Sequence, residues 1–242
     1  MDGFDPGSSF GPEVAARYDD DLRGDEAETV AFLSELAGDG AALEFAIGTG
    51  RIALPLAAGG IRVDGIELSE AMVARMRGKL GGNDLDVVIG DMSAADAPRS
   101  GYGLVYLVFN TIHNLLTQDD QVRCFENASR HMTDGWVFVV EASAPGAWLR
   151  GRQFVDAEYV GNDEVALDVN RYDPVNQILD ENHVHLSSDG VRLGPISQRI
   201  AFPSELDLMA RIAGLSLVDR TGGWCREPFT ADSIRHISVY GR

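Results

Sequence analysis

The sequence predicts an α/β fold, with a doubly wound, mostly parallel sheet of seven strands and a small antiparallel β cap. Five short apolar runs between residues 42 and 142 alternate with amphipathic segments. This alternation is typical of a parallel sheet with helices on both faces. Residues 165–201 instead hold three consecutive apolar runs separated by turn residues, which indicates antiparallel strands. Two more strands are expected at 215–219 and 236–240.

The N-terminal part is predicted to be a loose arm followed by a helix. The first dozen residues are rich in Gly, Ser, Pro and Asp, a composition typical of a loose arm. Apolar residues at helical spacing predict a helix over 13–37, ended by two glycines. The five strands of the alternating region are expected at 42–47, 61–67, 85–89, 102–109 and 136–142.

Hydroxyl side chains mark the starts of three later helices. Ser69, Thr117 and Ser204 each precede an amphipathic segment, and we expect each to cap the helix that follows. The first of these helices should carry Met76 and Leu80 on its inner face. The antiparallel strands are expected at 165–172, 178–186 and 191–201, within an insert over 146–203 of a single domain that spans 1–242.

Composition narrows the class of protein. The 242 residues contain 20 Lys and Arg against 38 Asp and Glu, a net charge of −18. A surface this acidic repels phosphate backbones and anionic lipid, so nucleic acid and membranes are not expected partners. The N-terminus lacks the pattern of a secretory signal, and two cysteines make no disulfide framework. We therefore expect a cytoplasmic protein; its oligomeric state is not predicted.

A glycine turn follows the first strand. Gly48-Thr49-Gly50 separates a buried strand from a helix, so the backbone can approach a ligand closely at the helix N-terminus. With Ala53 the turn also fits the G-x-G-x-x-A form of a dinucleotide site. Because many strand-to-helix turns are glycine-rich for packing alone, this match is weak by itself.

Acidic residues end the next two strands. Glu67 follows Gly50 by 17 residues, at a position where a carboxylate can bind the two hydroxyls of a ribose. Asp91 can accept from an exocyclic amine, and the side chain of Met92 suits the face of an adenine. These residues fall at the carboxyl ends of successive strands, where open α/β sheets bind ligands. The pattern predicts a nucleoside site.

Three segments together resemble the cofactor motifs of class I S-adenosylmethionine-dependent methyltransferases. They are residues 44–50, Gly65-Ile66-Glu67-Leu68-Ser69 and Gly90-Asp91-Met92. The resemblance covers roughly residues 15–142, and the strands after 215 fit the family's closing antiparallel hairpin. It implies a Rossmann-like fold, S-adenosylmethionine as cofactor, and cofactor contacts from ten residues: Tyr18, Glu44, Ala46, Gly48, Gly50, Glu67, Leu68, Asp91, Met92 and Phe109.

The resemblance also implies what several of these residues do. The carboxylate of Glu44 supports the methionyl amino group, often through water, while Glu67 holds the ribose. Tyr18, in a Tyr-Asp motif, closes over the methionine end. Two positions depart from the family pattern. Ala46 replaces the usual first glycine, and Leu22 stands where a second Tyr is often found.

The acceptor is expected beside residues 109–114, just past the fourth strand. His113 is the candidate general base, because a neutral imidazole is available near neutral pH; the alternative is a histidine that only hydrogen-bonds its loop. Asn110, Tyr172 and Arg199 are further candidates for binding the acceptor, although Arg199 alternatively pairs with a neighbouring carboxylate.

No metal site is predicted. His183 and His185 share one face of their expected strand, but the spacing supplies no third ligand.

The predicted reaction is transfer of a methyl group from S-adenosylmethionine to a nitrogen, or an oxygen, of a small-molecule acceptor. A weaker resemblance of layout links the chain to amino-sugar and glycine-type N-methyltransferases. One alternative is a nicotinamide-dependent oxidoreductase, against which the missing Tyr-x-x-x-Lys pattern argues. The other alternative is an adenosyl-binding domain without catalytic activity.

Overall fold

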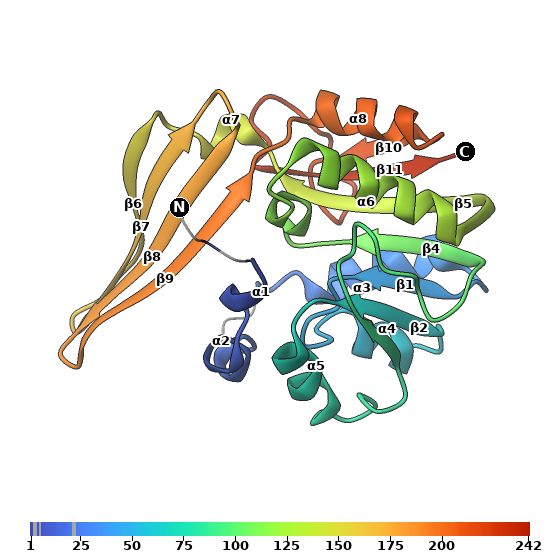
Figure 1. Ribbon diagram of the computed structural model, residues 1–242, viewed down its shortest axis with the longest axis horizontal. Helices are drawn as coiled ribbons and strands as arrows, with labels where there is room; N and C mark the ends of the chain where they lie inside the picture. The colour runs from blue at the N-terminus through green and yellow to red at the C-terminus, as the bar shows by residue number, and fades with distance from the viewer. Residues whose placement is uncertain (2–3, 5, 21–22) are drawn as a thin grey trace.

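The computed structural model describes residues 1, 4, 6–20 and 23–242, which form two sheets (Figure 1). The larger sheet has seven strands in the order β10-β11-β5-β4-β1-β2-β3. Strands β1 to β5 pair in parallel, and β11 runs antiparallel to both of its neighbours. The strands are β1 Ala42–Phe45, β2 Val63–Glu67, β3 Asp86–Ile89, β4 Tyr102–Leu107, β5 Met132–Ser143, β10 Ser216–Thr221 and β11 Arg235–Gly241. The predicted fold class is confirmed.

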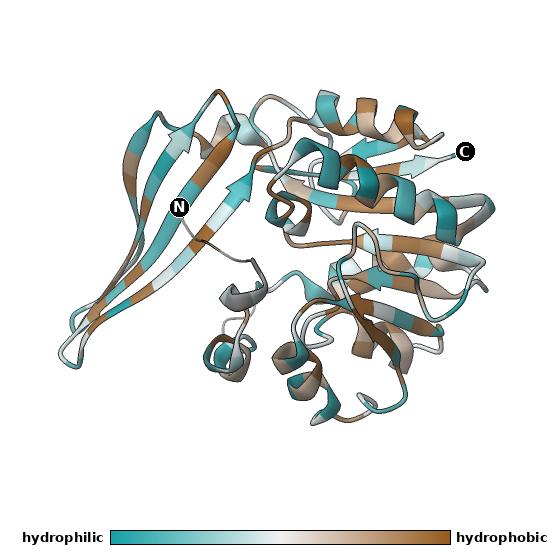
Figure 2. Cartoon of the chain, in the orientation of Figure 1, coloured by the Kyte–Doolittle hydropathy of each residue, from teal (hydrophilic) through white to brown (hydrophobic). Residues whose placement is uncertain are grey.

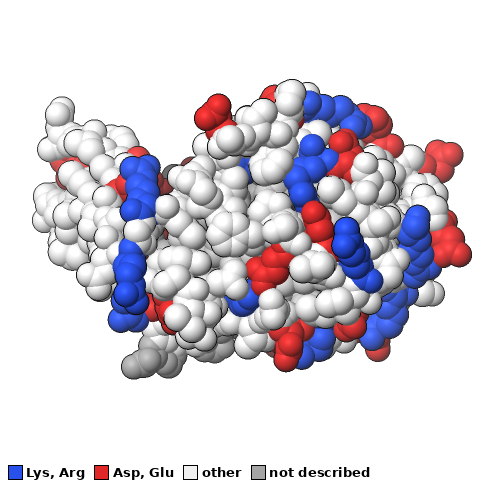
Figure 3. Space-filling model, turned by 90° about the horizontal axis from the view of Figure 1, so that it is seen from above, with Lys and Arg blue, Asp and Glu red and all other residues white. Residues whose placement is uncertain are grey.

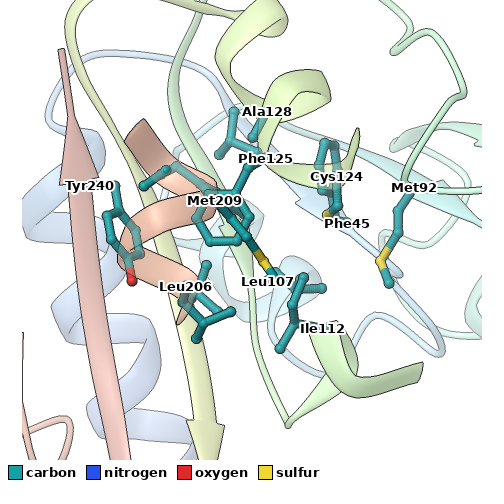
Figure 4. Close-up of a cluster of buried hydrophobic side chains, with 14 of the residues drawn as sticks. Phe45, Met92, Leu107, Ile112, Cys124, Phe125, Ala128, Leu206, Met209 and Tyr240 are labelled. Atoms are coloured by element: carbon teal, nitrogen blue, oxygen red, sulfur yellow. The ribbon is translucent and has the colours of Figure 1, made fainter. Parts of the chain in front are cut away.

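Helices cover both faces of this sheet and divide the core into two layers. Helices α3 (Glu26–Ala37), α4 (Ala53–Ala58) and α5 (Glu70–Arg77) pack on one face. Helices α6 (Gln118–His131) and α8 (Pro203–Ile212) pack on the other. Figure 4 shows this second layer, where Phe125 lies between the sheet and the side chains of α8.

The smaller sheet, here called the cap, is antiparallel throughout. Its strands are β6 Gln153–Val160, β7 Glu164–Asp173, β8 Ile178–Ser187 and β9 Gly190–Arg199, and the short helix α7 (Pro145–Trp148) precedes it. Hydrophobic and hydrophilic residues are mixed along the cap strands in Figure 2, as expected for a sheet that is not buried on both faces. Strand β6 was not predicted, because this largely exposed edge strand contains no continuous apolar run.

A buried polar network joins the cap to the larger sheet. The guanidinium of Arg199, at the end of β9, donates to Glu205 Oε1 at 2.7 Å and to Gln177 Oε1 at 2.9 Å. A third bond reaches the side chain of Gln121 on α6, whose own amide donates to the carbonyl of Arg199 at 2.9 Å. These bonds hold the ends of β9, α6 and α8 together.

The N-terminal segment differs most from the prediction. The expected loose arm contains helix α1 (Pro6–Ser9), and the expected helix over 13–37 is two helices, α2 (Pro12–Arg17) and α3. The hydroxyl of Ser69 donates to the carbonyl of Phe10 at 2.6 Å, and Asp19 accepts from Thr49 Oγ1 at 2.6 Å. These tertiary bonds supply the order that local composition does not. Leu22 lies outside the described residues.

The predicted helix caps are confirmed at two of three positions. Ser69 Oγ accepts from the Met72 N–H at 3.2 Å, and Thr117 Oγ1 from the Asp120 N–H at 3.1 Å. Ser204 is instead the second residue of α8, because Pro203 begins the helix one position earlier. Leu80 was also placed wrongly, since α5 ends before it and its side chain is 99% exposed. No helix among the described residues is long and apolar enough to cross a membrane.

The cap junction yields a test of stability. Glu205→Ala leaves the buried guanidinium of Arg199 without its carboxylate, and an uncompensated buried charge costs about 3 kcal/mol. We expect urea unfolding to show that loss. Glu126→Ala, an exposed position on α6, should change the free energy of unfolding by less than about 0.5 kcal/mol. Equal losses in the two variants would contradict a junction held by this ion pair.

Candidate active site

A cavity of about 350 Å³ opens at the carboxyl ends of β1, β2 and β3. This is the edge of the sheet at which the sequence predicts a nucleoside site. Its walls come from the loops after these strands, from the segment before α6 and from the N-terminal segment: Gly7, Phe10, Ala46, Ile66, Glu67, Leu68, Ser69, Gly90, Asp91, Met92, Thr111, Asn114, Leu115, Leu116 and Asp120.

Glu67 joins two of these loops. Its Oε2 accepts from the backbone N–H of Gly48 at 2.8 Å, and its Oε1 accepts from the N–H of Ser69 at 2.8 Å. The residue is 6% exposed, and burial raises the pKa of its carboxyl above the usual range despite these two bonds. A carboxylate has about four lone-pair sites. Each oxygen of Glu67 therefore keeps capacity for a hydroxyl donor in the cavity.

The turn after β1 has left-handed backbone at three positions. Ala46, Gly48 and Gly50 have φ angles of 53°, 57° and 75°. A Cβ on Gly50 would lie 2.8 Å from Met76 Cγ and 2.9 Å from Leu54 Cγ, so this position requires glycine for space as well. Ala46 adopts the conformation that a glycine would take without cost, and its methyl group borders the cavity.

Asp91 and Met92 form the wall beyond β3. Asp91 is exposed, and its Oδ1 accepts from the Ser93 N–H at 2.7 Å, which orients the carboxylate. Met92 is 7% exposed and packs against the core with its side chain at the cavity wall. This wall combines an acceptor with an apolar surface, as an aromatic amine requires.

Glu44 lies beneath the turn and does not line the cavity. Its carboxylate accepts from the hydroxyl of Tyr106 at 2.9 Å. Burial, together with the nearby charge of Glu67, raises the pKa of Glu44 to about 8 although the Tyr106 bond opposes the shift. The carboxyl is therefore protonated at neutral pH in the free protein.

Two aromatic rings enclose Arg51 next to the turn. Its guanidinium carbon lies 4.8 Å from the ring centroid of Tyr18 and 4.6 Å from that of Phe109. Burial raises the pKa of Tyr18, partly opposed by the charge of Arg51. Arg51 is not among the residues predicted from the sequence, although a cation between Gly50 and the start of a helix is a visible signal.

Strained backbone follows β4. Phe109 and Asn110 have φ angles of 69° and 62°, which non-glycine residues adopt at a cost. Glu141 on β5 holds this conformation by accepting from the Phe109 N–H at 2.8 Å, and it also pairs with Arg23 at 2.6 Å. The side-chain oxygen of Asn110 accepts from the N–H of Ser143.

Comparison with known proteins identifies the family. A family model described as a methyltransferase domain matches residues 42–135. The CcbJ methyltransferase from Streptomyces caelestis is 35% identical, superposes with a TM-score of 0.91, and the match covers 98% of this chain and 99% of that one.

The chain belongs to the class I S-adenosylmethionine-dependent methyltransferases.

Two more distantly similar proteins are also methyltransferases. S-adenosylmethionine-bound CalS10, an amino pentose methyltransferase from Micromonospora echinaspora involved in calicheamicin biosynthesis, has 21% identity, a TM-score of 0.70 and coverage of 95% of this chain and 96% of its own. Cypemycin N-terminal methyltransferase from Streptomyces sp is 24% identical over 204 residues, which are 83% of this chain and 82% of that protein. The methyltransferase thus uses S-adenosylmethionine, and neither predicted alternative, nicotinamide-dependent or non-catalytic, finds support.

The predicted acceptor residues His113, Tyr172 and Arg199 do not line the cavity, although the charge of Arg199 acts on the other two. His113 is fully buried and is not among the cavity walls, and its ring lies beside the backbone of Ala201. Burial lowers its pKa to about 4. Tyr172 and Arg199 also lie off the cavity, with Arg199 engaged at the cap junction. The geometry does not favour His113 as the base, and its role stays a prediction.

The left-handed conformation of Ala46 predicts that a substitution by glycine makes the protein more stable. Ala46→Gly should raise the free energy of unfolding by about 0.5–1 kcal/mol, because glycine adopts this φ without strain. Ala74→Gly, in the exposed middle of α5, should lower it by about 1 kcal/mol. Urea unfolding of both variants provides the comparison. A loss in both would show that Ala46 is not strained.

The raised pKa of Glu44 predicts a pH dependence of stability. An unfolded Glu titrates near 4.3, so the folded chain keeps a proton that the unfolded chain releases between about pH 4 and 8. The stability that protonated Glu44 contributes is present below that range and is lost as the pH rises toward 8. In Glu44→Gln, the decline in unfolding free energy from pH 5 to pH 8 should shrink by roughly 3 kcal/mol.

The control for this experiment is Glu28→Gln, an exposed position on α3. From pH 5 to pH 8, the free energy of unfolding of this variant should decline as much as that of the unaltered protein. If Glu44→Gln declines as steeply as the unaltered protein, Glu44 is ionised in the folded state and the interpretation is wrong.

Proposed function

We propose that this methyltransferase transfers the methyl group of S-adenosylmethionine to a nitrogen atom of a small-molecule acceptor. The observation that carries the proposal is the cavity at the strand ends, where Glu67 presents unused lone pairs beside the glycine turn. The nitrogen acceptor is supported by the similarity to an amino pentose methyltransferase and to an N-terminal methyltransferase. These likenesses support the class of acceptor without naming the molecule.

The cavity walls fit the parts of the cofactor. In the proposed arrangement, Glu67 accepts from the ribose hydroxyls and Asp91 accepts from the amine of the adenine. Leu68 and Met92 supply the apolar surface for the base, and Ala46 lies under the turn that approaches the cofactor. In this arrangement the carboxylates of Glu67 and Asp91 each receive a hydrogen-bond donor from the cofactor.

The methionine end is proposed to lie toward Arg51. S-adenosylmethionine carries an α-carboxylate, and a guanidinium is the natural partner of that group. Tyr18 and Phe109 enclose Arg51 and would exclude water from this end. Glu44, under Gly48 and Gly50, would meet the ammonium group through water, and that positive charge would favour its ionised form.

The main contribution of the site to the reaction is proposed to be alignment of the acceptor with the methyl group, and not proton transfer. The bound cofactor supplies a methyl group that is already activated, so the protein must hold the acceptor in line and exclude water. Positioning of this kind is worth roughly 7–11 kcal/mol. The carboxylates of Asp91 and Asp120 at the cavity favour capture of an ammonium over an anionic acceptor. The ammonium loses a proton to water before transfer, and the free nitrogen lone pair then attacks the methyl carbon while the C–S bond breaks and S-adenosylhomocysteine leaves. Acidic and basic side chains are interspersed on the face seen in Figure 3, which suits a small molecule better than a polyanion.

The experiment that tests the proposal compares matched acceptors. An amino sugar and the hydroxyl analogue in which oxygen replaces the amine are each incubated with S-adenosylmethionine labelled on the methyl group. Mass spectrometry then locates the label. We expect the label on the amine nitrogen and none on the hydroxyl analogue, and label on oxygen alone would contradict nitrogen transfer.

The proposed role of Glu67 predicts a loss of cofactor affinity. Glu67→Gln replaces one acceptor oxygen by a donor, so either the Gly48 N–H or the ribose loses its partner. Calorimetry with S-adenosylhomocysteine should show a loss of about 10- to 100-fold. Glu70→Gln, exposed in the first turn of α5, should bind as the unaltered protein does.

Thermal unfolding of Glu67→Gln and Glu70→Gln without ligand shows whether a loss of affinity comes from a loss of stability. If Glu67→Gln melts with the unaltered protein and also keeps its affinity, the assignment of Glu67 to the ribose is wrong.

The cap has a proposed role in binding the acceptor. We propose that residues 146–203 act as an insert of a single domain and cover the acceptor, supported by the network that ties Arg199 to α6 and α8. The cytoplasmic location and the absence of nucleic-acid and membrane partners stay predictions from the sequence.

A further inference from the structure

Two carboxylates and one imidazole, groups that can bind metal ions, meet on one face of the cap. Glu158 comes from β6, Asp168 from β7 and His183 from β8, and their donor atoms all lie within 4.8 Å of one another. Asp168 is directly opposite His183 in the register of β7 and β8. The register shifts between Ala157 and Tyr159, and such a bulge re-aims the side chain at its centre, here Glu158.

Two buried side chains beside this cluster have oxygen acceptors without a hydrogen-bond donor among the described residues. Glu181 is two residues from His183 on β8, so both point to the same face. It is 4% exposed, yet its carboxylate makes no hydrogen bond or ion pair with any part of the chain that the structure describes. Asn170 is directly opposite Glu181, and its buried Oδ1 is likewise without a partner.

Asn170 is also oriented toward the cluster. Its side-chain amide donates to the carbonyl of Asp168 at 3.1 Å, so the side chain bends along β7 toward that residue. Buried acceptors without donors are costly, and they are satisfied by water, by an added donor or by a cation.

The charges of the cluster are not balanced by the chain. Asp156 pairs with Arg150 at 3.0 Å, but within the described residues no Lys or Arg pairs with Glu158, Asp168 or Glu181. In the part of the chain that the structure describes, their only cationic partner is His183, whose Nδ1 lies 2.7 Å from Asp168 Oδ1.

We propose that Glu158, Asp168 and His183 bind a divalent transition-metal ion, such as Mn²⁺ or Zn²⁺, with the carboxylate of Glu181 nearby to balance its charge. An imidazole with carboxylate oxygens suits these ions, whereas Mg²⁺ and Ca²⁺ prefer oxygen alone. The ion takes the place of the proton shared by His183 and Asp168. It links β6, β7 and β8, and it neutralises charge on a chain whose net charge is −18.

The site lies in the cap, and none of its residues lines the cofactor cavity. The ion therefore stabilises the cap sheet and takes no part in methyl transfer. The two histidines noted in the sequence, His183 and His185, do not share it; the other ligands come from neighbouring strands, where a single strand's spacing cannot reveal them.

Calorimetry on the full chain, without an affinity tag and after treatment with a chelator, tests the proposal with MnCl₂ and ZnCl₂. We expect one ion per chain, and His183→Ala should weaken binding at least about tenfold. His185→Ala is the matched control, because His185 lies on the same strand and face but contacts Glu164, at 3.3 Å, instead of the cluster. This control should keep the affinity of the unaltered protein.

Glu158→Gln provides a second variant whose side chain is exposed, so its folding is not at risk. It should also weaken binding at least about tenfold, with an unchanged circular dichroism spectrum. The electron paramagnetic resonance spectrum of bound Mn²⁺ reports the same loss independently. Absence of binding at millimolar metal, or equal weakening by His183→Ala and His185→Ala, would overturn the proposal.

Discussion

The two backbone N–H groups held by the carboxylate of Glu67 are the constraint on which the cofactor end of the fold depends. One belongs to Gly48 in the turn after β1, and the other belongs to Ser69 at the start of α5. A single buried side chain therefore fixes two loops relative to each other. Ser69 in turn caps α5 and binds the carbonyl of Phe10. The position of the N-terminal wall of the cavity follows from that chain of bonds.

A second carboxylate organises the other side of the turn. Glu141 accepts from Arg23, from Arg235 and from the N–H of Phe109. It holds the strained residues after β4, and through them the aromatic ring that covers Arg51. Glu67 and Glu141 are both buried at the carboxyl edge of the sheet, where unpaired backbone N–H groups are available to stabilise negative charge.

The sequence predicts the sheet and the cavity walls well for a physical reason. Strand ends are set by local apolar runs, and parallel strands bring their carboxyl ends to one edge. Glu67, Asp91 and Met92 therefore meet at one cavity, as expected from their positions alone.

The features that the sequence does not reveal depend on contacts between distant segments. Ser69 binds Phe10, the residue that follows helix α1. The side chain of His113 is buried because two left-handed residues precede the 3₁₀ helix Thr111–Asn114 and turn the chain. Arg199 has partners from α6, α8 and the β7–β8 turn, none of which its own strand indicates. Edge strand β6 lacks an apolar run because it is largely exposed.

A crystal structure of the protein with S-adenosylhomocysteine would test the role of Glu67 in holding the cofactor. We expect the nucleoside in the cavity at the ends of β1, β2 and β3, with both ribose hydroxyls within hydrogen-bond distance of Glu67 and the adenine between Met92 and the residues before α6. A nucleoside bound elsewhere, or a ribose turned away from Glu67, would contradict it.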